Sequence, residues 1–205
     1  MEKIDFKKEL KGLYAPGSKV VTIVDVPAFN FLMIDGKGNP NTSIEYRQAI
    51  ETLYAVSYSA KFKIKKSKAA IDYSVMPLEG LWWVENETIF NLNNKDAWNW
   101  TAMILQPHFV NSELISESIE NVKDKKGLNN LDKINFASFE EGLAVQIMHI
   151  GPYSEEEPNI KRMHSFIEEN GFCVSGKHHE IYLKDPRKSA PEKLQTILRQ
   201  PIKKK

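Results

Sequence analysis

Glu180 is the residue whose type and position most clearly suggest chemistry. It stands in the stretch GKHHEIYLKDPR, residues 176–187, of which HHEIYL, residues 178–183, is predicted to be a strand. Side chains alternate along a strand, so Glu180 shares one face with His178 and Tyr182 while the intervening residues form an ordinary core face. Two interpretations are open. Glu180 is either a surface glutamate of an open sheet, or a groove carboxylate that attracts a cation or transfers protons.

Aromatic residues are concentrated in one region of the chain. All four tryptophans, Trp82, Trp83, Trp98 and Trp100, lie within 19 residues. Trp98 and Trp100 are two residues apart and would share one face of a strand, whereas the adjacent Trp82 and Trp83 would face opposite ways. The indoles form either a large packed core or a wall for a flat or cationic ligand, which they would hold by stacking and cation–π attraction.

Four tyrosines are further candidates beside these rings. Tyr54 and Tyr58 are four residues apart, on one face of a predicted helix. Tyr73 precedes the tryptophan-rich region, in the strand that would correspond to that of Glu180, and Tyr153 lies in a loop before a later helix. The strand of Tyr73 also carries Asp72, the first-half counterpart of Glu180 if the two halves face each other. The histidines show no metal-ligand spacing, so neither a metal site nor a cofactor is predicted.

Three consecutive acids, Glu155, Glu156 and Glu157, open the predicted helix that follows Tyr153. Ser154 and Glu157 are spaced as a capping box, and acidic residues are favoured at a helix N-terminus. Capping is therefore their expected role, although one of the three could face the groove.

The elements that position these residues repeat in one order: strand, strand, helix, strand, strand. The predicted elements are strands 19–26 and 28–35, a helix from 44 to about 60, strands 69–84 and 96–107, a linking helix at about 111–126, strands 134–141 and 143–150, a helix after 151–158, strand 178–183, and a segment 193–202 that turns into a strand.

We expect an N-terminal segment, residues 1–18, followed by one domain, residues 19–205, with pseudo-repeats at about 19–107 and 134–205. The predicted fold class is α+β. It comprises paired units with antiparallel sheets, helices on one side and a ligand cleft between the halves.

The bulk composition excludes several classes of protein. The 205 residues include 28 Lys and Arg against 27 Asp and Glu, a balance that argues against a dedicated nucleic-acid binder. No apolar run approaches the roughly 18 residues of a membrane span, and the N-terminus shows no signal-peptide core. The single Cys173 rules out an internal disulfide. We therefore expect a cytoplasmic protein with no membrane partner and no direct nucleic-acid partner.

Four longer motifs resemble the GyrI-like small-molecule-binding family, and more narrowly its stand-alone branch with a tryptophan-rich insert. They are YSVMPLEGLWW (73–83), WNWTAMILQPHFV (98–110), HIGPYSEEEPNIKRMHSFIEENGF (149–172) and HHEIYLKDPRKSAPEKLQTILRQPI (178–202). The resemblance implies a tandem pair of β-α-β-β-type units around a ligand cleft. It also implies kinship with effector-binding domains of AraC-type and MerR-type multidrug regulators, in which a buried glutamate meets cationic, aromatic drugs.

The resemblance also assigns roles to residues of this chain. Glu180 matches the family glutamate and becomes the candidate acid/base, with Tyr58 as a second catalytic candidate. The candidate ligand-binding residues are Trp82, Trp100, Tyr73, Tyr153, Tyr182 and Glu180.

Three functions follow. The first is binding of planar aromatic, cationic or electrophilic xenobiotics, with detoxification as a consequence. The second is hydrolysis on the same pocket, since some stand-alone members are similar to hydrolases that open the cyclopropane ring of DNA-alkylating compounds. The third is a protein-binding module that inhibits a partner such as gyrase.

Overall fold

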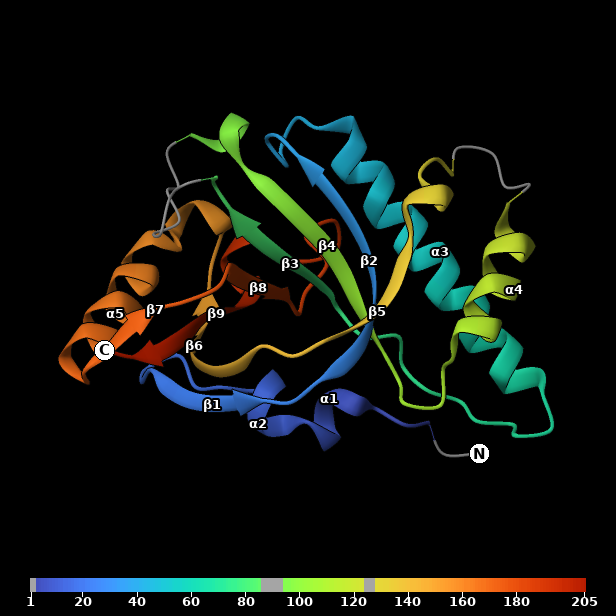
Figure 1. The fold of residues 1–205 in the computed structure, drawn as a ribbon, viewed down its shortest axis with the longest axis horizontal. Coiled ribbons are helices and arrows are strands. Elements are labelled where there is room, and N and C mark those ends of the chain that lie inside the picture. Colours follow the sequence, from blue (N-terminus) through green and yellow to red (C-terminus); the bar gives the residue numbers. More distant parts are fainter. Residues whose placement is uncertain (1–2, 86–93, 124–127) are drawn as a thin grey trace.

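The computed structural model describes residues 3–85, 94–123 and 128–205, and these residues form one large antiparallel sheet with flanking helices (Figure 1). The strands are β1 Thr22–Val26, β2 Phe29–Lys37, β3 Leu78–Trp83, β4 Asn99–Gln106, β5 Asn135–Phe139, β6 Gly142–Ile150, β7 Phe172–Val174, β8 His178–Tyr182 and β9 Gln195–Lys204. The α-helices are α1 Phe6–Glu9, α2 Lys11–Tyr14, α3 Ile44–Lys66, α4 Ser112–Val122 and α5 Glu157–Glu169. The predicted α+β class is confirmed.

The strand order shows how the two halves join. Along the sheet it is β1-β6-β9-β8-β3-β4-β2-β5, with β7 paired to β9 outside this path. Each half contributes a block of three strands, and the first strand of each half pairs with the block of the other half. The blocks meet at β3 and β8, where Gly80 lies opposite Glu180. Neither half therefore completes its sheet without the other.

Both long helices that cover the sheet lie on the same face, which we call the front face. Residues directly opposite each other in a sheet point to the same side. Leu198 of β9 is opposite Glu180, and it belongs to the apolar cluster of Ile160 and Met163 on α5. On the other side of Glu180, Tyr46 of α3 contacts the ring of Trp82, two residues beyond Gly80. In Figure 1, α5 lies at one end of the sheet and α3 with α4 at the other.

The helix α3 is longer than predicted. Ser43 caps its N-terminus, with the side-chain oxygen accepting a hydrogen bond from the Tyr46 backbone N–H, as expected for a serine at this position. The helix continues past Ala60 to Lys66, and its last turns carry three lysines, Lys63, Lys65 and Lys66. Lysines are favourable at a helix C-terminus, but they do not extend the apolar stripe from which the end of the helix was predicted. Helix α4, predicted for 111–126, ends at Val122, and residues 124–126 lie outside the described part of the chain.

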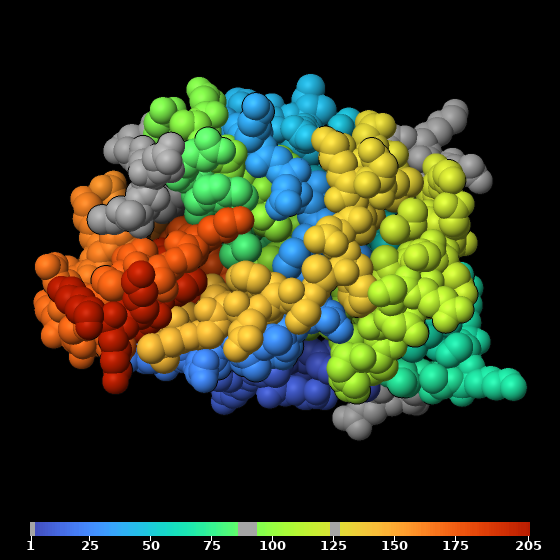
Figure 2. Space-filling model, in the orientation of Figure 1, coloured from blue at the N-terminus to red at the C-terminus, as the bar shows by residue number. Residues whose placement is uncertain are grey.

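The N-terminal segment differs most from its prediction. Residues 1–18 were expected to be a polar leader, yet they contain the short helices α1 and α2, with the rings of Phe6 and Tyr14 buried at 7% and 4% exposure. Phe6, Leu10, Leu13 and Tyr14 recur at helical spacing, but the run is short and lies among lysines, so the segment was expected to be polar. Tyr14 reaches Glu79, which faces away from α3 and α5, so α2 covers the face of the sheet that we call the back face. Figure 2 shows the blue N-terminal part beside the yellow and gold residues of β5 and β6.

Two local predictions require correction. The expected capping box is not formed, because the N-cap of α5 is Glu156 and its side chain makes no capping hydrogen bond. The predicted strand at 69–84 is formed only from Leu78 onward, and Tyr73 makes just an isolated bridge to Ile4. Helix α5 ends at Glu169, and the short strand β7 follows it. None of the helices among the described residues is long and apolar enough to cross a membrane.

Candidate functional site

Glu180 is a buried carboxylate at the centre of the front face. Its residue exposure is 6%, although it stands on a strand where Gly80 and Leu198 are its lateral neighbours. Gly80 has no side chain to cover it, and a Cβ atom there would lie 2.8 Å from Nε1 of Trp82, so the indole of Trp82 occupies the space above the glycine. The surface-glutamate interpretation is therefore wrong for this structure.

The Glu180 carboxylate is held by a chain of hydrogen bonds. The indole N–H of Trp82 donates to the Tyr182 hydroxyl at 3.1 Å, and that hydroxyl donates to Oε2 of Glu180 at 2.6 Å. On the other side, Nε2 of His178 lies 3.5 Å from Oε1. Both carboxylate oxygens thus have a defined neighbour, which fixes the direction in which the group points.

Six aromatic rings form a connected cluster beside this carboxylate, which Tyr182 of the cluster contacts directly. Tyr46 of α3 stands with its ring centroid 5.4 Å from that of Trp82 and 4.9 Å from that of Trp100. Trp98 packs edge-on against Trp82 at 5.3 Å, and Tyr153 packs edge-on against Tyr182 at 5.6 Å. A Cβ atom at Gly36 would overlap the Trp100 ring, so a second glycine makes room for a second indole.

A second buried carboxyl group, Glu156, lies near Glu180. It sits in the turn before α5 and is 3% exposed. Burial is the main cause that raises the pKa of Glu156 well above its usual range, and the negative charge of Glu180 raises it further, while the Thr196 hydroxyl lowers it in part. Burial therefore favours the protonated form of Glu156 close to the carboxylate of Glu180, the arrangement of an acid/base pair.

The phenols of this region remain protonated at neutral pH. Burial, followed by the neighbouring carboxyl groups of Glu156 and Glu180, raises the pKa of Tyr153 to about 12. Burial is also the main cause that raises the pKa of Tyr182 and of Tyr46 well above the usual range of a tyrosine, and the charge of Glu180 adds to both shifts. These hydroxyls are consequently hydrogen-bond donors and not phenolate bases. We call this set the front-face site; it consists of Tyr46, Trp82, Trp98, Trp100, Tyr153, Glu156, Glu180 and Tyr182.

The structure brings five of the predicted ligand-binding residues together in this site, namely Glu180, Trp82, Trp100, Tyr153 and Tyr182. It does not bring Tyr58 or Tyr73 there. The Tyr58 ring stacks between Tyr54 and Phe62 on the exposed side of α3 and is 45% exposed. The buried Tyr73 ring contacts Phe6 and Phe109, near the N-terminal segment.

Glu156 and Tyr46 belong to the site but were not singled out by the sequence. One of the three acids before α5 was expected to face the groove as an alternative to capping, and nothing in the stretch SEEE distinguished Glu156 from its neighbours. Tyr46 lies in the first turn of α3, directly after a loop, where periodicity is weakest. Asp72, the predicted first-half counterpart of Glu180, instead pairs with Lys61 at 3.4 Å and Lys65 at 2.7 Å.

Comparison with known proteins gives a family match. Residues 19–203 match the family described as the GyrI-like small molecule binding domain. No protein with a curated description matches the chain.

Solved structures of similar proteins cover nearly the whole chain. An uncharacterized conserved protein from Listeria innocua is 45% identical, with a TM-score of 0.89, over 98% of this chain and 100% of its own. A hydrolase from Listeria innocua is 44% identical, with a TM-score of 0.86 and the same coverage. The EcmrR C-terminal domain is 12% identical, with a TM-score of 0.56, over 91% of this chain and 98% of its own, and shares the fold.

Proposed function

Because this chain belongs to the GyrI-like family of small-molecule-binding domains, we propose that its front-face site binds planar aromatic cations of the kind found among xenobiotics. The observation that carries the proposal is a buried carboxylate, Glu180, beside a cluster of aromatic rings.

The chemistry of the site favours a flat guest with a positive charge. The protonated Glu156 and the protonated phenols leave Glu180 as the negative centre of the site. Indole and phenol faces attract cations, and this attraction is stronger where water is excluded. The buried indole N–H of Trp100 has no hydrogen-bond partner among the described residues, so it is available to a polar atom of the guest.

Entry to the site requires side chains to move. Tyr153 is the most exposed ring of the front-face site, at 37%, and it packs on Tyr182, which in turn covers Glu180. We infer that a guest displaces Tyr153 first and then replaces the Tyr182 hydroxyl as the neighbour of the carboxylate.

The first experiment compares a cation with its uncharged parent. N-methylphenanthridinium and phenanthridine have the same ring system, and quenching of tryptophan fluorescence would report the binding of each. We expect the cation to bind at least tenfold more tightly at pH 7.5, a difference of about 1.4 kcal/mol. Equal dissociation constants, or no quenching by either compound, would contradict the proposal.

Hydrolysis is the second candidate function, and the carboxyl pair favours it. Glu180 is placed to accept a proton from water while Glu156 carries one to donate. For a cyclopropane conjugated to a carbonyl, the water oxygen bonds to a ring carbon and the ring C–C bond breaks. The electron pair moves to the carbonyl oxygen, which takes the Glu156 proton, and the proton from water goes to Glu180. A similar protein described as a hydrolase supports the same reaction class.

The second experiment tests turnover. Incubation with a cyclopropane-containing DNA alkylator in ¹⁸O-labelled water should give an adduct that carries the label, detected by mass spectrometry. Glu156→Gln is expected to slow adduct formation by about 100-fold, the typical contribution of a general acid, with cation binding little changed. The matched control is Glu157→Gln, at the next position, where the exposed side chain pairs with Lys161. If no labelled adduct forms, the protein does not hydrolyse this compound. If both variants form the adduct at the same rate, Glu156 takes no part in the reaction.

A further inference from the structure

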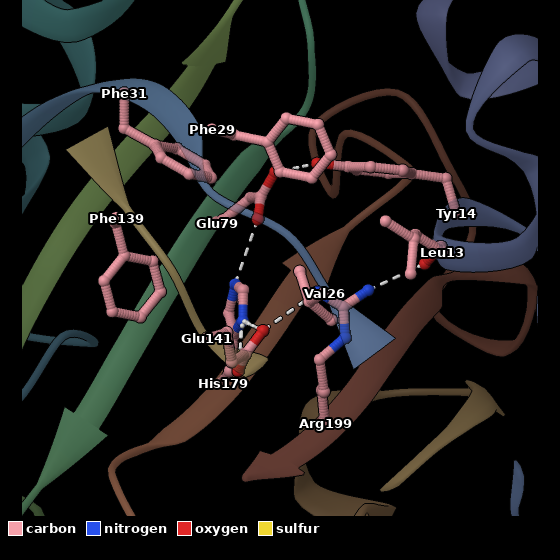
Figure 3. A pocket seen from close by; sticks show the side chains of 10 residues that line it. All are labelled: Leu13, Tyr14, Val26, Phe29, Phe31, Glu79, Phe139, Glu141, His179 and Arg199. Carbon is pink, nitrogen blue, oxygen red and sulfur yellow. Dashed lines mark hydrogen bonds and ion pairs between the residues drawn. The ribbon is translucent and has the colours of Figure 1, made fainter. Parts of the chain in front are cut away.

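A second group of buried charges lies on the back face of the sheet (Figure 3). The Tyr14 hydroxyl donates to Oε1 of Glu79 at 2.6 Å, and Oε2 of Glu79 lies 3.0 Å from Nε2 of His179. Nδ1 of the same imidazole lies 3.0 Å from Glu141, which accepts a hydrogen bond from Arg199 at 3.1 Å. We call these five residues the back-face relay.

The relay is balanced in charge and closed to ligands. Two carboxylates face two cations, and the side chains of Glu79, Glu141, His179 and Arg199 are all at most 2% exposed. Burial alone would lower the pKa of His179, but Glu141 and Glu79 outweigh it and raise this pKa to about 9. The adjoining cavity measures about 10 Å³, which is too small for an organic ligand. Buried ions of this kind cost free energy unless every partner is in place, so the relay demands one arrangement of its strands.

The N-terminal segment completes the relay. Tyr14 supplies the hydroxyl for Glu79, and the carbonyl of Leu13 accepts a hydrogen bond from Arg199 at 2.8 Å. Next to them, the Gln146 side chain donates to the carbonyl of Gly12 at 2.8 Å. All three of these N-terminal residues precede residue 19, where the match to the family begins.

Relay residues and front-face residues alternate along the same two strands. Glu79 precedes Gly80 on β3, and His179 precedes Glu180 on β8, with Gly80 and Glu180 directly opposite each other. Neighbouring side chains of a strand point to opposite faces. A shift of β3 or β8 that changes the position of Glu79 or His179 on the back face therefore also changes the position of Gly80 or Glu180 on the front face.

We propose that the N-terminal segment and the back-face relay together position the front-face site, with Tyr14 and His179 as positioning residues for Glu180 and the surrounding indoles. Only the expected effect on ligand binding rests on the proposed function. The positioning itself is measured without any ligand, because three of the four tryptophans belong to the front-face site.

The test uses tryptophan emission in a Trp83→Phe background, so that only front-face indoles report. Tyr14→Phe removes one hydroxyl and leaves Glu79 without that donor. We expect red-shifted emission, an increase of about twofold in acrylamide quenching, and a dissociation constant for N-methylphenanthridinium that rises three- to tenfold. Tyr73→Phe is the matched control, since its buried hydroxyl has no hydrogen-bond partner among the described residues. It should leave all three quantities unchanged.

A pH titration supplies a readout that a merely structural role would not give. The charged and titratable groups facing His179 are Glu79 from β3, Glu141 from the turn before β6, Arg199 from β9 and, through Glu79, Tyr14 from α2. Indole emission should be constant from pH 7 to 8 and change with a midpoint near 9, where His179 loses its proton. Glu79→Gln should move that midpoint down by at least one pH unit.

Emission that is the same in Tyr14→Phe, Glu79→Gln and the parent at every pH would overturn the inference. Emission that responds as expected while no compound binds would support positioning and count against the proposed function.

Discussion

Glu180→Gln is expected to weaken the binding of N-methylphenanthridinium by about 100-fold. The substitution keeps the size of the side chain and an oxygen that accepts the Tyr182 hydroxyl, but it removes the negative charge of a group that is 6% exposed. Removing one charge of a buried pair costs about 2–5 kcal/mol of binding free energy, and 100-fold corresponds to about 2.7 kcal/mol. Tryptophan quenching or calorimetry at pH 7.5 measures the change.

Phenanthridine is the control for this prediction, because it offers the same rings without a charge. Its affinity should change by less than about threefold in Glu180→Gln, since stacking on Trp82 and Trp100 is retained. Circular dichroism should show an unchanged fold. Equal losses for charged and uncharged ligands would mean that Glu180 supports the shape of the site and does not recognise charge, and the proposal of a cation site would fall.

The features of the site that depend on strand alternation could be predicted from the sequence. A glutamate in the middle of a predicted strand, with His178 and Tyr182 at two-residue spacing on the same face, drew attention to Glu180. The clustering of tryptophans pointed to the same region and placed Trp98 and Trp100 on one face, but it left open which of Trp82 and Trp83 shares that face. Period-two patterns of this kind are local, so they survive without knowledge of how strands pair.

The features that depend on tertiary contacts could not be predicted. Glu156 differs from Glu155 and Glu157 only in facing Glu180 across the turn before α5, a contact over 24 residues of chain. Tyr14 lies in a stretch that reads as polar, and its burial depends on Glu79, which is 65 residues away. The exchange of β1 and β5 between the two halves likewise follows from pairing and not from pattern.

Glu141→Gln is expected to lower the free energy of unfolding by about 3–5 kcal/mol at pH 6.5. The Glu141 side chain is 1% exposed and accepts from both His179 and Arg199, so its loss leaves two buried cations with only the carboxylate of Glu79. Breaking a buried charge pair from one side carries a penalty of this size. Urea unfolding followed by circular dichroism measures it. Glu120→Gln is the matched control, because that carboxylate pairs with Lys123 where both side chains are more than 60% exposed, and it should cost less than about 0.5 kcal/mol.

The pH dependence of the same variant separates the relay from ordinary packing. The pKa of His179 is raised from 6.5 to about 9 by folding, so its contribution to stability is complete below pH 6.5 and is lost as the pH rises through 9. A shift of this size corresponds to about 3 kcal/mol.

Glu141 titrates at the acidic end of the range. Burial alone would raise its pKa, but the charges of His179 and Arg199 lower that pKa below 4.5, so the contribution of Glu141 to stability is present above that pH and is lost in more acidic solution. The stability difference between wild type and Glu141→Gln should therefore be largest between about pH 4.5 and 6.5 and should shrink toward pH 9, because His179 in the variant has already lost the partner that held its proton. A difference that stays constant from pH 5 to 9 would show that Glu141 acts through packing alone and that its ion pair with His179 does not stabilise the fold.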